Sequence, residues 1–275
     1  MSKSGLTPAR MNYILWAIFL AFMIIPAVRP IGIPFPIGPE AKHAYELVQN
    51  LPEGSLVFFS VDASIGGWAE VGPGGEALFQ HVMAKRHRVV FVALTAPDGP
   101  LIAEQMVNKY HVKDTRKYGV DYVIFPYLPG GVTAAMAMAD DFWKAFGKDY
   151  YGSPLDTLPI MKDVHGAKDF KLAITLDNNA GTETLATQWW TKYKTVIISQ
   201  TMVMMYSWLR PYKDGGQVEA LLSGARHGAE YEYLIKSPGA GMASTDMISL
   251  THAGMVIAVI ISNSVYYFVR KGEKK

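Results

Sequence analysis

Two long apolar segments near the two ends of the chain constrain its fold most. Residues 11–28 (MNYILWAIFLAFMIIPAV) contain no charged side chain, and residues 247–269 (MISLTHAGMVIAVIISNSVYYFV) contain no acid, lysine or arginine. A helix rises about 1.5 Å per residue, so both lengths suit a hydrocarbon core about 30 Å thick. We therefore expect two transmembrane helices. The alternatives are a cleaved signal peptide for the first, although no small-x-small site follows it, and a buried core helix for the second.

The basic residues that flank these segments indicate the orientation of the chain. Lys3 and Arg10 lie in residues 1–10, and the basic tail RKGEKK forms residues 270–275. Cytoplasmic segments beside membrane helices carry an excess of lysine and arginine. Both tails are therefore predicted to be cytoplasmic, and the region between the two helices extracytoplasmic. The chain is thus expected to be a two-pass protein of the cell membrane, with the lipid bilayer as its first partner.

The charge balance and the absence of cysteine exclude several classes of function. The two tails hold six lysines and arginines against one glutamate, whereas the whole chain has a net charge of only +2. The region between the tails is therefore mildly acidic, and nothing in it indicates binding to nucleic acid. A chain without cysteine has no disulfide, no thiolate metal site and no cysteine nucleophile.

Between the predicted membrane helices, short apolar runs alternate with segments of helical periodicity. Unbroken runs rich in Val, Ile and Phe are typical of strands that are buried on both faces. The alternation predicts an α/β domain with a doubly wound, mostly parallel five-stranded sheet, Rossmann-like or flavodoxin-like. The predicted strands are Ser55–Val61, Arg88–Leu94, Asp121–Phe125, Phe170–Leu176 and Thr195–Ser199, and the predicted helices are 75–86, 99–111, 132–146, 181–192 and 216–235.

Composition also predicts the boundaries of this domain. Five prolines between residues 26 and 39 indicate a stiff, extended spacer, so residues 29–50 are interpreted as a spacer that ends in a short helix. The α/β domain is then expected at residues 51–240. Residues 147–169 show no clear period and are expected to form an ordered excursion or a lid. In the last predicted helix the apolar residues at helical spacing are Val218, Leu221, Leu222, Ala225 and Ala229.

A glycine-rich stretch after the first predicted strand, DASIGGWAEVGPGG at residues 62–75, is interpreted as a loop. No choice among its glycines gives the G-x-G-x-x-G register of a dinucleotide site directly after the strand. Gly67 and Gly72 have the spacing of a phosphate-binding loop, but Pro73 stands where that loop requires lysine. We therefore expect no nucleotide and no other cofactor.

Polar residues follow several predicted strands, where a doubly wound sheet binds its ligands. None of the loops 62–75, 95–100, 126–133 and 177–183 contains lysine or arginine, and all but 126–133 contain acids, which favours a polar neutral or cationic ligand over a phosphate. Asp and Asn are equally typical of turns and helix caps, so that interpretation stays open. The candidate ligand-binding residues are Asp62, Ser64, Gly130, Gly131, Asp177, Asn178 and Asn179.

Signatures of catalysis are missing from the chain. It contains neither G-x-S-x-G nor H-E-x-x-H, and its seven histidines are scattered, so no metal site is predicted. Asp62 and Asp177 would serve acid–base chemistry only if they lie close together. Arg226 and Glu230, four residues apart on a predicted helix, are expected to form a surface ion pair or, alternatively, to line a pocket.

Two further patterns point to contacts with partners. The stretch QTMVMMYSWL follows the fifth predicted strand, and its residues Met202, Met204, Met205 and Trp208 form either core or an apolar lip that touches a partner or the membrane. Small residues recur every four positions in both membrane segments and are typical of close helix packing. These packing candidates are Ala17, Ala21, Gly254, Ala258 and Ser262.

The layout resembles poorly characterised prokaryotic membrane proteins in which an extracytoplasmic Rossmann-like domain lies between two single membrane anchors. The resemblance rests on this architecture and on phrases such as YYGSPLDTLPIMKD (150–163) and GARHGAEYEY (224–233), and it implies no activity. We expect a non-enzymatic subunit that assembles with itself or with other membrane proteins. The alternatives are a module that binds or senses a small polar ligand, and an envelope hydrolase or transferase.

Overall fold

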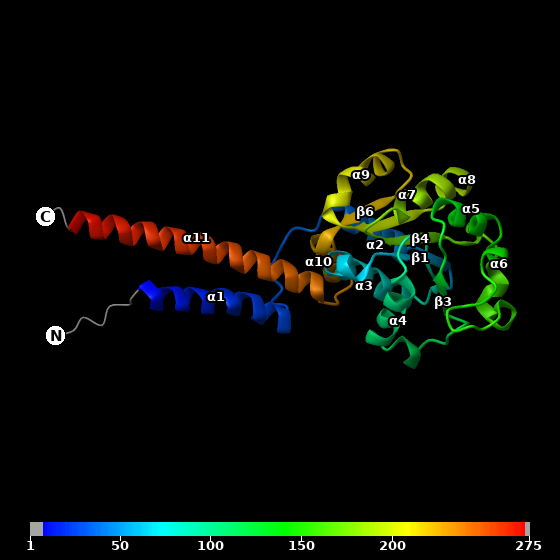
Figure 1. Cartoon of the computed structure of the whole chain (residues 1–275), viewed down its shortest axis with the longest axis horizontal. Coiled ribbons are helices and arrows are strands. Elements are labelled where there is room, and N and C mark those ends of the chain that lie inside the picture. The colour runs from blue at the N-terminus through cyan, green and yellow to red at the C-terminus, as the bar shows by residue number, and fades with distance from the viewer. Residues whose placement is uncertain (1–7, 273–275) are drawn as a thin grey trace.

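The computed structural model of the chain describes residues 8–272 (Figure 1). An α/β domain lies at one end. Two helices, α1 (Pro8–Val28) and α11 (Ala240–Gly272), project from it side by side and form a two-helix stalk. Among the described residues, one stretch, Ala240–Ser264 in α11, is long and apolar enough to cross a membrane, whereas the apolar part of α1, Asn12–Val28, is shorter. Length and composition thus identify one candidate membrane helix where the sequence predicted two.

The domain is built on a six-stranded parallel sheet with the order β3-β2-β1-β4-β5-β6. This is the doubly wound order of Rossmann-like folds, so the predicted fold class is confirmed while the predicted number of five strands is wrong. All five predicted strands are present within one or two residues of their expected starts. The strands are β1 (Leu56–Asp62), β2 (Arg88–Ala93), β3 (Tyr122–Tyr127), β4 (Leu172–Asp177), β5 (Ile197–Thr201) and β6 (Ala220–Ser223).

The sixth strand occupies part of a segment that the sequence assigned to a helix. Residues 220–223 (ALLS) pair with β5 and are fully covered, and the helix that follows begins only at Gly224, which has a φ of +64°. A short apolar run does not distinguish a buried strand from a buried helix by periodicity. The open edge of β5 and the left-handed turn at Gly224 decide the outcome, because glycine adopts this φ without steric cost.

Helices cover both faces of the sheet and bury one core on each side. The first face carries α2 (Pro39–Gln49), α3 (Trp68–Ala84), α4 (Gly99–Lys109) and α10 (Gly224–Leu234). The second face carries α5 (Val132–Asp140), α6 (Phe142–Ala145), α7 (Gly181–Leu185), a π turn at Ala186–Trp190, α8 (Thr191–Tyr193) and α9 (Val203–Asp214). Between α6 and β4, short 3-10 turns bury Leu155, Ile160 and Met161, so residues 147–169 form an ordered excursion.

The glycine-rich stretch is not a loop beyond residue 67, because α3 begins at Trp68 and runs through it. The glycines within α3 are buried where this helix crosses its neighbours. A Cβ at Gly74 would clash with the side chain of Gln200, and one at Gly228 of α10 would lie 2.7 Å from the backbone nitrogen of Gly74. The low helix propensity of glycine is therefore outweighed by the close packing that it permits between α3, α10 and the sheet.

Candidate functional site

The first candidate site lies at the switch point of the sheet, between the ends of β1 and β4. Asp62 is the last residue of β1 and Asp177 the last residue of β4, and the two are direct neighbours in the parallel register. The convergence of these two predicted residues is therefore present in the structure. Both side chains are fully buried.

Asp62 is held by groups of its own fold. Its Oδ1 accepts hydrogen bonds from the backbone N–H groups of Leu94 and Thr95, both at 2.7 Å, and from the Thr95 hydroxyl at 3.0 Å. Its Oδ2 accepts the Ser60 hydroxyl. Burial, together with the charge of Asp177, raises the pKa of Asp62 to about 6. The carboxylate thus fastens the loop after β2 to the end of β1.

Asp177 accepts hydrogen bonds from backbone N–H groups at the beginning of α7. Its Oδ1 accepts the backbone N–H groups of Asn179 at 2.8 Å and Gly181 at 3.2 Å, and its Oδ2 accepts that of Thr182 at 2.9 Å. These are the N–H groups that a helix start leaves without partners. The arrangement is that of a turn and helix-cap carboxylate, which is one of the two interpretations that the sequence left open.

The polar residues beside Asp62 and Asp177 bond to one another and fill the space at the switch point, so they do not line an open crevice. The Asn178 Oδ1 accepts the backbone N–H of Ser64 at 3.2 Å, and its amide nitrogen donates to the Ser64 hydroxyl at 3.0 Å. Gly67 packs so closely on Asn178 that a Cβ there would clash with it. Asn179 is exposed, and its amide donates weakly to the Thr95 carbonyl at 3.4 Å. The carboxylates of Asp62 and Asp177 have no exposed oxygen with which to meet a ligand.

Gly130 and Gly131, the remaining predicted ligand residues, lie elsewhere along the sheet edge. They follow β3, which is separated from β1 by β2. Both have positive φ angles, +122° and +50°, and the nearest atoms around Gly130 belong to Ala134 in the first turn of α5. These glycines turn the chain into α5, and no contact joins them to the Asp62 cluster.

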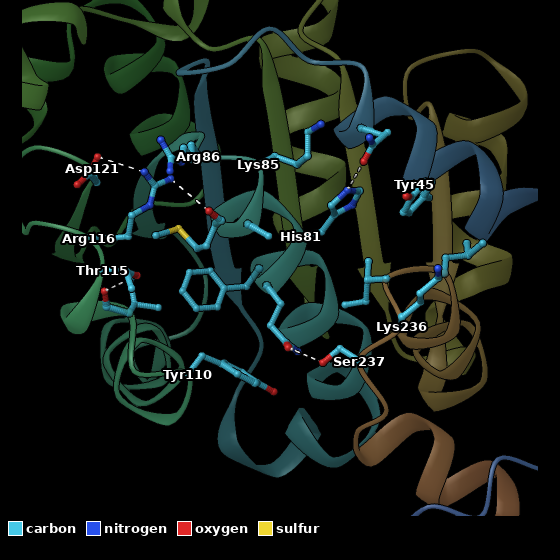
Figure 2. Close-up of a pocket in the computed structure, with 18 residues that line it drawn as sticks. Tyr45, His81, Lys85, Arg86, Tyr110, Thr115, Arg116, Asp121, Lys236 and Ser237 are labelled. Atoms are coloured by element: carbon cyan, nitrogen blue, oxygen red, sulfur yellow. Dashed lines mark hydrogen bonds and ion pairs between the residues drawn. The ribbon is translucent and has the colours of Figure 1, made fainter.

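A second candidate site is a cavity of about 1030 Å³ on the first face of the domain (Figure 2). The ends of three helices, α3, α4 and α10, surround it, and it extends toward the edge where the strands begin. Basic, aromatic and apolar side chains alternate on its walls. The main ones are Tyr45, Phe79, His81, Lys85, Arg86, Tyr110, Arg116, Asp121, Leu234 and Lys236. We call it the basic cavity, because four lysines and arginines face a single carboxylate there.

Arg116 is the best-fixed cation of the basic cavity. Its guanidinium donates to the Met83 carbonyl at 3.3 Å and the His87 carbonyl at 3.1 Å, and it pairs with Asp121 at 3.4 Å. Its Nε is buried and has no hydrogen-bond partner in the described structure. Figure 2 shows the guanidinium of Arg116 bonded to Asp121 and to the segment that carries Lys85 and Arg86.

His81 forms a neutral part of the cavity wall. It stacks on Tyr45 with ring centroids 4.7 Å apart, and it hydrogen bonds to the Tyr231 hydroxyl at 2.9 Å and to Gln49 at 3.0 Å. Burial, with the nearby charge of Lys85, lowers the pKa of His81 to about 4. The imidazole is therefore uncharged at neutral pH and positions Tyr45 rather than carrying protons.

The sequence analysis missed the basic cavity because it considered only the loops that follow strands. The signal was present in the segments that lead into β2 and β3, which read AKRHR at residues 84–88 and KDTRK at residues 113–117. Parallel strands begin at a common edge, so these two clusters had to lie near each other. Lys236 carries no such signal, because its place depends on where α10 ends.

The apolar lip predicted after β5 is divided by the helix α9. Met202 and Met205 are half-buried and pack against the two cores. Met204 and Trp208 are 76% and 62% exposed, and Val203, which precedes Met204, is also exposed. We call Val203, Met204 and Trp208 the α9 patch. Part of the predicted lip is thus core, and part is a surface that remains uncovered in the described chain.

The predicted packing residues of the membrane segments lie in the stalk. Gly254 meets α1 closely, since a Cβ there would lie 2.7 Å from the ring of Phe22. Ala21 and Ala258 are half-buried, whereas Ala17 and Ser262 are exposed. The two helices of the stalk therefore approach each other closely at Gly254.

No group of three or more His, Asp or Glu side chains able to hold a metal ion occurs within residues 8–272. No protein-family model matches this chain, and no curated protein matches it either. The function must therefore be inferred from the geometry of the stalk, the α9 patch and the two candidate sites.

Proposed function

We propose that this chain is a non-enzymatic, two-pass subunit of the cell membrane, whose extracytoplasmic α/β domain assembles with copies of itself or with other membrane proteins. The observation that carries the proposal is the stalk. Most of the large apolar side chains along α11 are more than half exposed, as are Tyr13 and Trp16 of α1; those of α11 are Ile248, Val256, Ile257, Val259, Ile260 and Ile261. Contiguous apolar surface of this extent is unfavourable in water and favourable in a bilayer.

The domain is joined to the stalk by buried carboxylates, which supports a fixed orientation at the membrane. Asp246 of α11 is fully buried and accepts the backbone N–H groups of Ile31, Gly32 and Ile33 at 2.6 to 2.9 Å. Glu232 of α10 accepts three backbone N–H groups at the start of α11, at 2.8 to 2.9 Å. Each bond satisfies a donor that would otherwise be unpaired, so the junction resists bending.

The proline-rich spacer lies against the domain rather than extending freely. Arg226 pairs with Glu230 at 2.9 Å, donates to the Pro36 carbonyl at 3.0 Å and lies 4.5 Å from the ring centre of Phe35. Glu230 also accepts the Gly38 N–H at 2.9 Å. The predicted ion pair thus clamps the spacer onto α10. Because α11 becomes exposed within about one turn of Asp246, the domain would sit directly on the bilayer.

Assembly is the role that the surface of the domain supports best. The α9 patch exposes three large apolar side chains on one helix, and the stalk offers small residues for close helix contact. The switch-point carboxylates, by contrast, are buried and fully hydrogen-bonded, so the geometry does not favour Asp62 and Asp177 as an acid–base pair or as ligand groups.

Native mass spectrometry of the full-length protein, extracted in a mild detergent, tests this proposal. The expected result is a homo-oligomer, at a multiple of 30.3 kDa, or a mixed complex of defined stoichiometry. The Met204→Ser/Trp208→Ser double variant should shift the population toward monomer. Leu101→Ser, which alters a partly exposed apolar side chain on the other face of the domain, should not. A lone monomer for the unaltered protein, with no co-purifying partner, would refute the proposal.

A further inference from the structure

We propose that the basic cavity binds an organic phosphate, a small molecule that carries a phosphate group on an apolar or aromatic body. The inference is independent of the proposed assembly function. The volume of the basic cavity, about 1030 Å³, is at the upper end of the range for small-molecule sites, and the cavity walls combine apolar rings with a few charged groups.

The charge of the cavity wall selects an anion. Lys85, Arg86, Arg116 and Lys236 face one carboxylate, Asp121, which is already paired with Arg116. The side chains of Lys85, Arg86 and Lys236 make no hydrogen bond or ion pair with any described residue. A ligand carboxylate would carry only one negative charge against these several cations. A phosphate group, which carries up to two negative charges, matches the charge of the cavity better.

The backbone at two of these cations is strained in the same way. Arg86 follows the end of α3 with a φ of +58°, and Lys236 follows the end of α10 with a φ of +56°. Each helix end closes with the same pair of backbone bonds, for example from Arg86 to the Met83 carbonyl and from Lys236 to the Tyr233 carbonyl, both at 3.1 Å. Glycine is the favoured residue at this position, because a side chain is disfavoured there. The chain keeps a long cation at both positions, and both cations line the basic cavity.

A competing explanation is that these cations only neutralise the carbonyl ends of the helices. Cations near a helix C-terminus do stabilise it. Arg116 has this role in part, since it donates to the Met83 and His87 carbonyls. Arg86 and Lys236, however, donate to no carbonyl with their side chains. Their charges therefore remain available to a ligand.

The remaining walls suit the body of such a ligand. Tyr45, Phe79 and Tyr110 present rings to the cavity, and Leu234 and Ile235 add apolar surface from the end of α10. Figure 2 shows Arg86 and Arg116 toward one end of the cavity, and Tyr45 and Lys236 on the opposite side. The cations therefore lie on both sides of the rings and attract the phosphate from both, while the body of the ligand lies against the rings.

The position of the cavity favours a soluble ligand over a lipid headgroup. Gly241 of α11 packs on Gly228, which packs on Gly74, so the stalk meets α3 in its first half. Lys85 and Arg86 lie beyond the end of α3, about 16 Å farther along the helix axis. A phospholipid in the bilayer below would not reach them without leaving the membrane. Both sources share the phosphate ester, and the test separates them.

Isothermal titration of the full-length protein in dodecyl maltoside, with 1-naphthyl phosphate as the probe, tests the proposal. We expect saturable binding with a Kd near or below about 1 mM, weaker binding at higher salt, and none with the neutral 1-naphthol. Phosphatidylglycerol added to the micelles should not compete. If phosphatidylglycerol displaced the probe, the phosphate site would stand and its natural source would be lipid. No saturable binding of 1-naphthyl phosphate would overturn the proposal.

Arg86→Gly and Lys236→Gly separate ligand binding from helix capping. Each removes a cation and relieves the left-handed strain, so each should weaken the Kd about tenfold or more while leaving the melting temperature unchanged or higher. His111→Gly is the matched control, because His111 follows the end of α4 with a φ of +49° and does not line the cavity. It should leave the Kd unchanged. Arg86→Gly and Lys236→Gly with a lower melting temperature and an unaltered Kd would show that the cations serve the helix ends alone.

Discussion

Replacement of Asp62 by Asn is expected to stabilise the protein at neutral pH. The carboxyl is fully buried beside Asp177, and its pKa is raised to about 6 from a value of 3.8 in the unfolded chain. Each pKa unit corresponds to about 1.36 kcal/mol, so the ionised Asp62 lowers the unfolding free energy at pH 7 by about 3 kcal/mol. Asn removes the charge, and its Oδ1 can still accept the backbone N–H groups of Leu94 and Thr95.

The pH dependence has a definite sign. Because the folded state holds the Asp62 proton more tightly than the unfolded state, the contribution of this group to stability is present below about pH 4 and is lost as the pH rises through about 6. The difference between Asp62→Asn and the unaltered protein should therefore be largest at pH 7 and should vanish near pH 4. For a domain of this size, about 3 kcal/mol corresponds to roughly 6 to 12 °C in melting temperature.

Tryptophan-fluorescence melting of the full-length protein in a neutral detergent, from pH 4 to pH 8, measures this difference directly. The matched control is Asp156→Asn, which removes a charge from an exposed turn and should alter the melting temperature little at any pH. The reasoning would be refuted by an Asp62→Asn variant that melts below the unaltered protein at pH 7. It would equally be refuted by a difference that does not change with pH.

Three further perturbations test separate parts of the structure. Because the pKa of His81 is lowered to about 4, this group should contribute stability that is present above pH 6.5 and lost as the pH falls toward 4. His81→Gln should reduce this loss of stability in acid, and a melting profile that is unchanged below pH 6.5 would contradict the lowered pKa of His81. Gly74→Ala should lower the free energy of unfolding by about 1–3 kcal/mol, because the added Cβ clashes with Gln200. Gly147→Ala, where a Cβ meets open space, should leave it unchanged, and equal effects in thermal melts would show that α3 is not packed as described. Asp246→Ala should leave three backbone N–H groups without their acceptor and expose the spacer, so hydrogen exchange at residues 31–33 should rise by at least about tenfold. Unchanged protection there would disprove the role of Asp246 in holding the spacer.

The strands and the fold class could be predicted because their signal is local. Runs such as LVFF in β1 and ITL in β4 are buried on both faces of a parallel sheet, and no other arrangement suits unbroken apolar runs that alternate with helices. The adjacency of Asp62 and Asp177 followed from the same topology, since both residues end strands that meet at the switch point.

The errors arose where tertiary contacts override local preference. The run ALLS of β6 fits a helix as well as a strand, and only the free edge of β5 decides between them. Glycines of residues 66–75 suggested a loop, yet Gly74 is helical because its neighbours leave no room for a side chain. The basic cavity needed the ends of three helices to be placed in space, which no single stretch of sequence specifies.

The orientation of the domain at the membrane is the claim on which the proposed function depends most directly. The chain has no cysteine, so single cysteines can be introduced by Ser4→Cys, Gly147→Cys and Lys274→Cys and treated with a membrane-impermeant maleimide in right-side-out vesicles. Gly147 is exposed on the domain, whereas Ser4 and Lys274 belong to the two basic tails. The proposal predicts labelling at position 147 in intact vesicles and at positions 4 and 274 only after the vesicles are opened. Protection of position 147, or labelling of either tail in intact vesicles, would contradict it.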